Sequence, residues 1–246
     1  MIRTIEPTVA GYPERLGAMR RPPARLWIRG DLPPASAVAV VGTRRPDADG
    51  LALARRLAGQ LVEHGYSVIS GLAQGIDCAA HRGALDAGGR TWAVVGCGVD
   101  VAVAPAAARD PALVSEMVER GGVLAEVPPG TTATAQALVA RDRIQSGLSA
   151  ATVVVQTDLA SGTMHTARFT LEQERLLVVL APGAERSDRA GWAGNAALSD
   201  PGGCDPALLH ARGRLAVRLA ARRPVADLVL DPDGNLTPLL DLISER

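Results

Sequence analysis

Residues 38–46 read Val-Ala-Val-Val-Gly-Thr-Arg-Arg-Pro. The run of small, mostly β-branched apolar residues at its start predicts a buried parallel strand. The Gly-Thr-Arg-Arg segment that follows has the composition of a tight turn, which exposes backbone N–H groups beside two positive charges and can hold an anion. Apolar residues then recur at helical spacing from Asp49 to His64. This part of the chain therefore predicts a strand, an anion-binding turn and a helix.

The same strand-turn-helix pattern recurs further along the chain. Helices are predicted at about residues 78–87 and 164–173, each of them after an apolar run and a Gly-containing turn. This alternation predicts an α/β fold, a doubly wound parallel Rossmann-like sheet with helices on both faces. Ligands of such sheets bind at the carboxyl ends of the strands, where these turns gather. The further predicted strands are residues 66–70, 91–95, 122–126, 151–156 and 176–180.

The chain divides into three segments. Residues 36–200 hold the predicted Rossmann-like domain. Residues 1–35 form a short lead-in rich in Pro and Arg, which is expected to pack on the domain through the Leu-Trp-Ile run at 26–28. Residues 201–246 form a C-terminal extension in which no winged helix is evident. In this extension the sequence predicts a helix at 206–222, a strand at 225–230 and a short amphipathic segment at 236–243.

The composition excludes several classes of protein. The 246 residues include 26 basic and 26 acidic side chains, so the net charge gives no global attraction to nucleic acid. Every basic residue is Arg, and without Lys neither a P-loop nor Schiff-base chemistry is possible. The cysteines form no Cys-x-x-Cys pair and the histidines show no metal-ligand spacing, so no metal site or disulfide framework is expected. No signal core or membrane-length apolar run is present, which predicts a cytoplasmic protein without a membrane partner.

The Gly-rich turns are not a dinucleotide fingerprint, because none has the Gly-x-Gly-x-x-Gly spacing. The turn Ser161-Gly162-Thr163 is better placed, since it precedes a predicted helix. Hydroxyls and free N–H groups at a helix start bind phosphate through the local dipole. The alternative is an ordinary helix cap made by Ser161 or Thr163.

Charged residues in two other places are candidates for a site. Arg141 and Arg143 could face the crevice together with Arg44 and Arg45, forming a positive groove suited to the backbone of a polyanion. A salt bridge through the intervening Asp142 is the alternative, and the sequence leaves both open.

Asp77 and His81 lie four residues apart on a predicted helix and could form a general acid and base pair. A cap or dipole role for Asp77 is the simpler interpretation. The sequence shows no nucleophile motif and no paired acidic metal cluster, so no catalytic residue is assigned.

A series of motifs, in this order, resembles the DprA/Smf family of DNA-processing proteins, which have a Rossmann-like domain. The resemblance covers roughly residues 10–200. The motifs are Val-Ala-Val-Val-Gly-Thr-Arg-Arg (38–45), Ser-Gly-Leu-Ala-Gln-Gly-Ile-Asp-Cys-Ala-Ala-His-Arg-Gly-Ala-Leu (70–85), Ala-Val-Val-Gly-Cys-Gly-Val-Asp (93–100), Glu-Val-Pro-Pro-Gly-Thr (126–131), Arg-Ile-Gln-Ser-Gly-Leu-Ser (143–149), Ser-Gly-Thr-Met-His-Thr-Ala (161–167) and Pro-Gly (182–183).

The resemblance implies a non-enzymatic protein that binds single-stranded DNA without a cofactor. Such a protein protects incoming strands during natural transformation and recombination, helps to load a RecA-type recombinase, and is typically a dimer. The turn after the first strand would contact phosphate, the second motif would shape the pocket, and the helix start at 161–163 would close it. The residues expected to bind DNA or phosphate are Gly42, Thr43, Arg44, Arg45, Gly71, Gln74, Gly75, Arg141, Arg143, Ser161, Gly162 and Thr163.

The sequence departs from the family at the expected groove. The family's aromatic-Pro-Arg-Arg-Asn-Arg run appears here as Leu-Val-Ala-Arg-Asp-Arg at residues 138–143. One Arg and the Asn are lost, and the acid Asp142 is expected to weaken phosphate binding. The usual Glu after the buried Val run is Gln156.

These departures keep two alternatives open. One is a nucleotide-binding sensor or a phosphoribohydrolase-like protein of the related Rossmann-like superfamily, whose Pro-Gly-Gly-x-Gly-Thr motif is only approximated at 129–131 and 161–163. The other is an interaction protein that has kept the fold and lost the groove. Salt-sensitive affinity for an oligonucleotide favours the DNA-binding function, and length-independent affinity for a mononucleotide favours the sensor.

Overall fold

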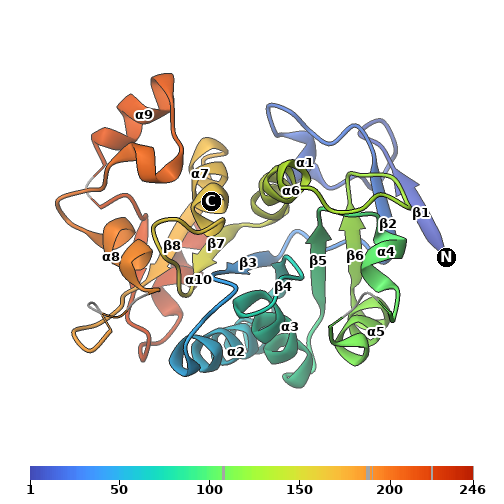
Figure 1. Cartoon of the computed structure of the whole chain (residues 1–246), viewed down its shortest axis with the longest axis horizontal. Coiled ribbons are helices and arrows are strands. Elements are labelled where there is room, and N and C mark those ends of the chain that lie inside the picture. The colour runs from blue at the N-terminus through green and yellow to red at the C-terminus, as the bar shows by residue number, and fades with distance from the viewer. Residues whose placement is uncertain (107–108, 187–188, 190, 223, 246) are drawn as a thin grey trace.

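A nine-stranded sheet forms the centre of the computed structural model, which describes residues 1–106, 109–186, 189, 191–222 and 224–245. The strand order is β1-β2-β6-β5-β4-β3-β7-β8-β9 (Figure 1). The α/β, doubly wound fold predicted from the sequence is confirmed. The strands are β1 (Ile2–Ile5), β2 (Leu26–Gly30), β3 (Ala37–Val41), β4 (Ser67–Ser70), β5 (Thr91–Val95), β6 (Gly122–Ala125), β7 (Ala151–Val154), β8 (Leu176–Leu180) and β9 (Leu228–Leu230).

The strands from β6 to β9 in this order are parallel. Every residue of β3 is buried, and Val38 pairs with Val68 of β4 on one side and Ala151 of β7 on the other. Such continuous apolar runs are needed because helices cover both faces of a parallel sheet. The strands predicted from these runs are confirmed.

The lead-in adds strands that the sequence did not predict. Strand β2 pairs antiparallel with β6, and β1 pairs antiparallel with β2 at the edge of the sheet. Leu26 and Ile28 are buried as expected, whereas Trp27 is half-buried. The sheet is therefore mixed, with a parallel body and an antiparallel edge.

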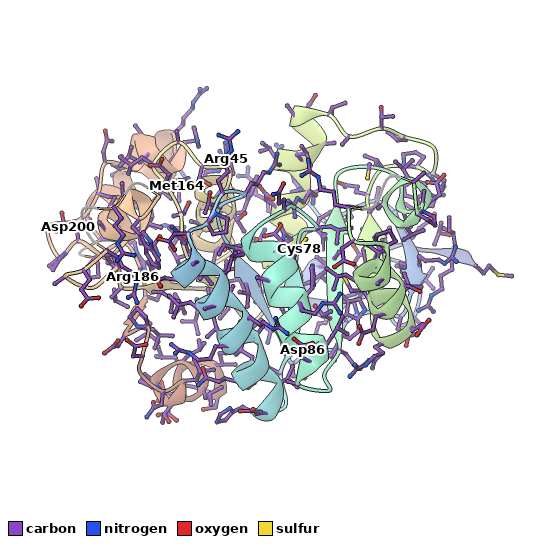
Figure 2. The ribbon with its side chains drawn as sticks, turned by 60° about the horizontal axis from the view of Figure 1, so that its bottom comes forward. Arg45, Cys78, Asp86, Met164, Arg186 and Asp200 are labelled. Atoms are coloured by element: carbon purple, nitrogen blue, oxygen red, sulfur yellow. The ribbon has the colours of Figure 1, made fainter. Side chains whose placement is uncertain are left out.

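Helices cover both faces of the sheet (Figure 1). Helices α2, α3 and α5 lie on one face, and α1, α6 and α7 lie on the other. Helices α2 and α3 run side by side (Figure 2), and Gly83 allows their close approach because a Cβ there would overlap the backbone of Arg55. The helices are α1 (Glu14–Gly17), α2 (Ala48–Glu63), α3 (Ile76–Asp86), α4 (Val99–Val103), α5 (Pro111–Arg120), α6 (Ala135–Leu148), α7 (Thr163–Glu172), α8 (Ala193–Ser199), α9 (Gly213–Ala220) and α10 (Thr237–Ser244).

The C-terminal extension differs in part from its prediction. The helix expected at 206–222 is interrupted: a 3₁₀ helix (Pro206–Leu209) ends at His210, which has a left-handed φ of 52°, and α9 follows. The predicted strand forms as β9 and pairs parallel with β8. Helix α10 packs Leu239 into the core beside α2. The extension thus completes one edge of the sheet.

Among the residues that the structure describes, no helix is both long and apolar enough to cross a membrane. In the same part of the chain, no group of three or more His, Cys, Asp or Glu side chains is placed to hold a metal ion.

Candidate functional site

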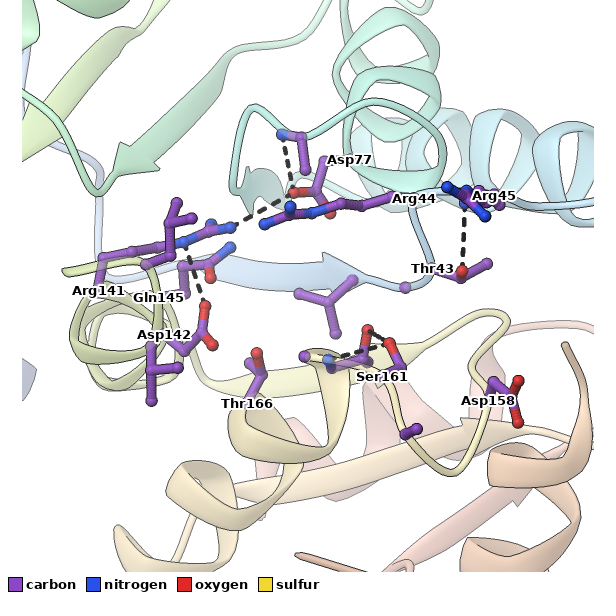
Figure 3. Close-up of a pocket in the computed structure, with 18 of the residues that line it drawn as sticks. Thr43, Arg44, Arg45, Asp77, Arg141, Asp142, Gln145, Asp158, Ser161 and Thr166 are labelled. Atoms are coloured by element: carbon purple, nitrogen blue, oxygen red, sulfur yellow. Dashed lines mark hydrogen bonds and ion pairs between the residues drawn. The ribbon is translucent and has the colours of Figure 1, made fainter. Parts of the chain in front are cut away.

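A crevice opens where the order of the strands changes direction. After β3 the chain adds β4, β5 and β6 on one side, and then β7, β8 and β9 on the other. The connections that leave β3 and β7 therefore diverge, which is the usual ligand position in an open α/β sheet. A pocket of about 510 Å³, which we term the switch-point pocket, lies there (Figure 3). It is lined by the turn after β3, by α6 and by the start of α7.

The turn after β3 is fixed by backbone contacts. Thr43 donates its N–H to the carbonyl of Gln156, 2.7 Å away, and accepts a hydrogen bond from the N–H of Ile76 at 3.2 Å. A Cβ on Gly42 would lie 2.6 Å from the Ile76 side chain and 2.7 Å from the Gln156 carbonyl oxygen. The close approach of β3, β7 and α3 thus requires glycine at residue 42.

The side chains of this turn place positive charge at the rim. Arg44 and Arg45 are both exposed and both line the pocket (Figure 3). Neither guanidinium forms an ion pair with any side chain in the described part of the chain. Both charges are therefore free to contact an anion.

The start of α7 forms the opposite wall. The hydroxyl of Ser161 accepts a hydrogen bond from the N–H of Thr163 at 3.2 Å and lies 3.1 Å from the Thr163 hydroxyl. Gly162 is the N-cap residue of α7 and no side chain caps the helix, so the contact between Ser161 and Thr163 closes the turn before it and is not the cap that was one of the two alternatives. The helix start still faces the pocket, since Ser161, Gly162 and Thr163 all line it. The positive end of the helix dipole is directed toward the same space as the two arginines.

The floor is a buried group of charged and polar side chains from α3 and α6. Arg141 lies between two carboxylates: its Nη2 is 3.9 Å from Asp77 Oδ2, and its Nε is 3.2 Å from Asp142 Oδ1. Arg141 also donates to the carbonyl of Val94 at 3.1 Å. The salt bridge through Asp142 that the sequence left open is therefore present, and Arg141 still lines the pocket.

Burial controls the titration of these carboxylates. Loss of water raises the pKa of Asp77, and the nearby Arg141 and a hydrogen bond from the Ala73 N–H oppose this effect. Burial also raises the pKa of Asp142 to about 7, again opposed by Arg141. Above pH 7 the Asp142 carboxylate is ionised and offsets the charge of Arg141.

Glycines in the second motif make room for this arrangement. A Cβ on Gly71 would overlap the Arg141 guanidinium and the Asp77 carboxylate. Gly75 has a φ of 93°, and a Cβ there would lie 2.5 Å from the Thr43 carbonyl oxygen. Both residues therefore shape the pocket. Gln74 lies outside the switch-point pocket and accepts a hydrogen bond from the side chain of Arg109.

A second pocket of about 610 Å³ continues the crevice across the ends of β4 and β5. It shares Arg44, Arg45 and Arg141 with the first pocket. Its lining also includes Gln74, Cys78, the charged side chains of Arg109 and Asp110, Thr132 and several apolar side chains. The two pockets together form an elongated groove with the two exposed arginines at its middle.

Arg143 lies outside both pockets, unlike its neighbour Arg141. It donates to the carbonyl of Arg21 at 2.9 Å and pairs with Glu126. Residues two apart on an α-helix point about 200° apart, so Arg141 and Arg143 of α6 cannot share one face. The expectation that both arginines face the crevice is wrong for Arg143, and a contact between Arg143 and DNA stays a prediction.

Asp77 and His81 are not placed as an acid and base pair in the pocket. His81 is fully buried, and its ring nitrogens lie 2.7 Å from Thr91 Oγ1 and 3.3 Å from the Gly71 carbonyl oxygen. Burial lowers the pKa of His81 to about 4, so the ring is neutral at physiological pH. Of the pair, Asp77 alone lines the pocket.

The fold and the sequence of the chain are similar to those of known proteins. A doubly wound sheet with exposed arginines at its switch point defines a Rossmann-like protein with a positively charged crevice rim. The protein-family model described as DNA recombination-mediator protein A matches residues 3–202, and the chain belongs to this family. The DprA/Smf resemblance found in the motifs is confirmed.

Curated relatives agree with this assignment. The chain is 34% identical over 177 residues to Protein Smf of Synechocystis sp., covering 70% of this chain and 44% of that protein. It is 35% identical over 177 residues to DNA processing protein DprA of Bacillus subtilis, covering 71% of this chain and 59% of that protein. The chain thus spans about half the length of the curated relatives that it matches.

Solved structures show the same fold. DNA processing protein A of Streptococcus pneumoniae superposes with a TM-score of 0.67 at 29% identity, covering 76% of this chain and 66% of that one. A structure of the Helicobacter pylori protein, which concerns its single-stranded DNA binding mode, gives a TM-score of 0.65 at 27% identity. It covers 76% of this chain and 84% of that chain.

The contact between Gly71 and the buried ion pair gives a first prediction. Gly71→Ala is expected to lower the free energy of unfolding by about 1–3 kcal/mol, because the added methyl group displaces Arg141 or Asp77. Urea denaturation measures this change. Gly162→Ala is the matched control, since a Cβ there meets no atom within 4 Å. Equal stability of the two variants would contradict the proposed packing.

The raised pKa of Asp142 gives a second prediction. Between its ordinary value of 3.8 and about 7, the folded protein binds a proton that the unfolded chain has released. The stability from this proton is present below pH 3.8 and is lost as the pH rises through 7. The variant Asp142→Asn has no carboxyl group to titrate, so it does not lose this stability. The unfolding free energy of the variant minus that of wild type should therefore increase by roughly 1–3 kcal/mol from pH 5 to pH 8.

Urea denaturation at the two pH values measures this difference. The control is Asp158→Asn, which removes an exposed carboxylate from the same pocket. A difference between Asp142→Asn and wild type that does not change with pH would show that Asp142 titrates normally.

Proposed function

We propose that this chain binds single-stranded DNA in the crevice at the switch point and does not cleave it. The observation that carries the proposal is a pair of exposed arginines, Arg44 and Arg45, at the carboxyl end of β3 opposite the start of α7, which pair with no carboxylate among the residues that the structure describes. Fixed cations and a helix start suit the phosphates of a nucleic-acid backbone. The relation to the Helicobacter pylori protein supports a single-stranded ligand.

The charge distribution predicts modest affinity. Arg141 is engaged by Asp77 and Asp142, so it contributes little to the field felt by a phosphate. The attraction then depends mainly on the two arginines at the rim. Phosphate contacts carry no sequence information, so this part of the binding is the same for all sequences.

The biological role proposed here follows from family membership. It is protection of single-stranded DNA during transformation or recombination and assistance in loading a RecA-type recombinase. We further propose that the protein is a cytoplasmic homodimer and acts without enzymatic activity or cofactor. These points rest on the family, since the chain spans about half the length of its curated relatives.

A nucleotide-binding sensor is the second candidate, and one observation favours it. The floor of the switch-point pocket is polar and buried, with the Gln145 amide among its lining groups. Such a floor suits a single nucleotide as well as one residue of a strand. Competition between oligonucleotides and mononucleotides distinguishes the two functions.

The double variant Arg44→Ala, Arg45→Ala tests the DNA-binding proposal. It is expected to bind all single-stranded sequences more weakly and to reduce the slope of log affinity against log salt by about one to two, because two phosphate contacts are lost. Fluorescence anisotropy of a labelled oligo-thymidine strand at several salt concentrations measures both effects. Duplex DNA and mononucleotides serve as competitors.

The matched control is Arg212→Ala with Arg214→Ala. Both of these arginines are exposed, and neither lines the switch-point pocket or its neighbour. The control should leave the salt slope near that of wild type. An unchanged slope in the rim variant, or equal losses in the two variants, would refute the assignment of the groove.

A further inference from the structure

The floor of the switch-point pocket contains an amide without a partner. Gln145 lines the pocket and is only 1% exposed. Its Nε2 makes no hydrogen bond with any group in the described part of the chain. A buried donor left unpaired is unfavourable because it has lost its hydrogen bonds to water, so such a group in a pocket indicates a ligand acceptor.

An acceptor lies next to this donor. Asp142 precedes Gln145 by three residues on α6, so both side chains lie on the same face of the helix. Both line the pocket (Figure 3), and the Asp142 carboxylate is ion-paired with Arg141, whose Nε lies 3.2 Å from Oδ1. A carboxylate has about four acceptor sites, so this pair leaves Asp142 able to accept hydrogen bonds.

The remaining walls fit a flat heterocycle. The pocket volume of about 510 Å³ is within the range that holds small organic ligands. Leu138 and Val139 contribute apolar surface to the lining, which can contact the faces of a ring. Arg44 and Arg45 line the same pocket at its rim, where a phosphate attached to that ring would be neutralised.

We propose that this floor recognises guanine. Guanine is the base whose edge carries two adjacent N–H donors next to a carbonyl oxygen. The two donors, on N1 and N2, match the two oxygens of the Asp142 carboxylate, and the O6 carbonyl accepts from the Gln145 amide. Adenine, cytosine and thymine have no pair of adjacent N–H donors on this edge, so they leave one of these protein groups unsatisfied.

This inference rests on the proposed function and goes beyond it. Phosphate contacts at the rim hold any strand, whereas the floor selects the base at one position. The same chemistry is offered by a guanine in a strand and by a free guanine nucleotide. The charged groups around Asp142 are Arg141, Asp77 and Arg44, and Asp142 accepts both donors when it is ionised, so the test is run at pH 8.

The experiment compares labelled oligo-thymidine strands in which one central base is exchanged. Wild-type protein should bind the strand with a central guanine about tenfold more tightly than strands with adenine, cytosine or thymine there. A strand with hypoxanthine in place of guanine lacks the 2-amino group and should lose most of this preference. This comparison uses the unmodified protein, so it does not depend on the folding of a variant.

The variant Gln145→Leu tests the amide. It should bind strands with guanine, adenine, cytosine or thymine at the central position with equal affinity. Gln136→Leu is the matched control, because Gln136 is exposed on the first turn of α6 and does not line the pocket. Thermal denaturation verifies that both variants are folded.

Each outcome decides between the claims. Salt-dependent binding of strands with no preference for guanine, or a preference that Gln145→Leu retains, overturns the base assignment and leaves the DNA-binding function standing. Guanosine monophosphate that binds tightly in the absence of any strand affinity supports the base assignment and refutes the DNA-binding function. Equal binding of the guanine and hypoxanthine strands refutes the role of the Asp142 carboxylate.

Discussion

The buried contact of Arg141 with two carboxylates determines the floor of the crevice. A guanidinium or a carboxylate alone in this position would carry a large desolvation penalty, and each is tolerated because the others are present. The contact joins α6 to the start of α3, and the missing side chain at Gly71 provides its space. It also removes Arg141 from the positive charge of the crevice. The electrostatics of the site therefore follow from one packing constraint.

The consequence is a division of the pocket into two parts. Arg44 and Arg45, which pair with no carboxylate among the described residues, lie at the rim, whereas the floor holds the Arg141 ion pairs and the Gln145 amide. A nucleotide has the same arrangement, with a charged phosphate at one end and a hydrogen-bonding base at the other. The acid at residue 142, where the family pattern has Asn, thus reduces phosphate attraction and supplies an acceptor for a base edge. The loss of phosphate attraction and the gain of a hydrogen-bond acceptor arise from the same substitution.

The sequence predicted the features that depend on local composition. The apolar run of β3, the turn at 42–45 and the helix start at 161–163 all lie where they were expected, because each follows from a few consecutive residues. The antiparallel strands β1 and β2 were missed, since β2 pairs with β6, which is far away in the sequence, and β1 joins the sheet only through β2.

Helix α6 shows why part of the site could not be predicted. Its second half is buried nearly all round, from Arg141 to Leu148, so it has no clear alternation of apolar and polar residues. Without a helix assignment, Arg141 and Arg143 could not be separated into different faces, and Gln145 could not be placed beside Asp142. Once the helix is known, the spacing of three residues from Asp142 identifies Gln145 as a pocket residue.

Hydrogen exchange of the backbone is the most direct test of the central claim, that nucleic acid occupies this crevice. Amide exchange is measured by mass spectrometry with and without a saturating oligo-thymidine strand at low salt. The account predicts slower exchange in peptides covering the turn at 42–45 and the helix start at 161–166, with no change in α9. Protection confined to other parts of the chain, or none in these two peptides, would contradict it.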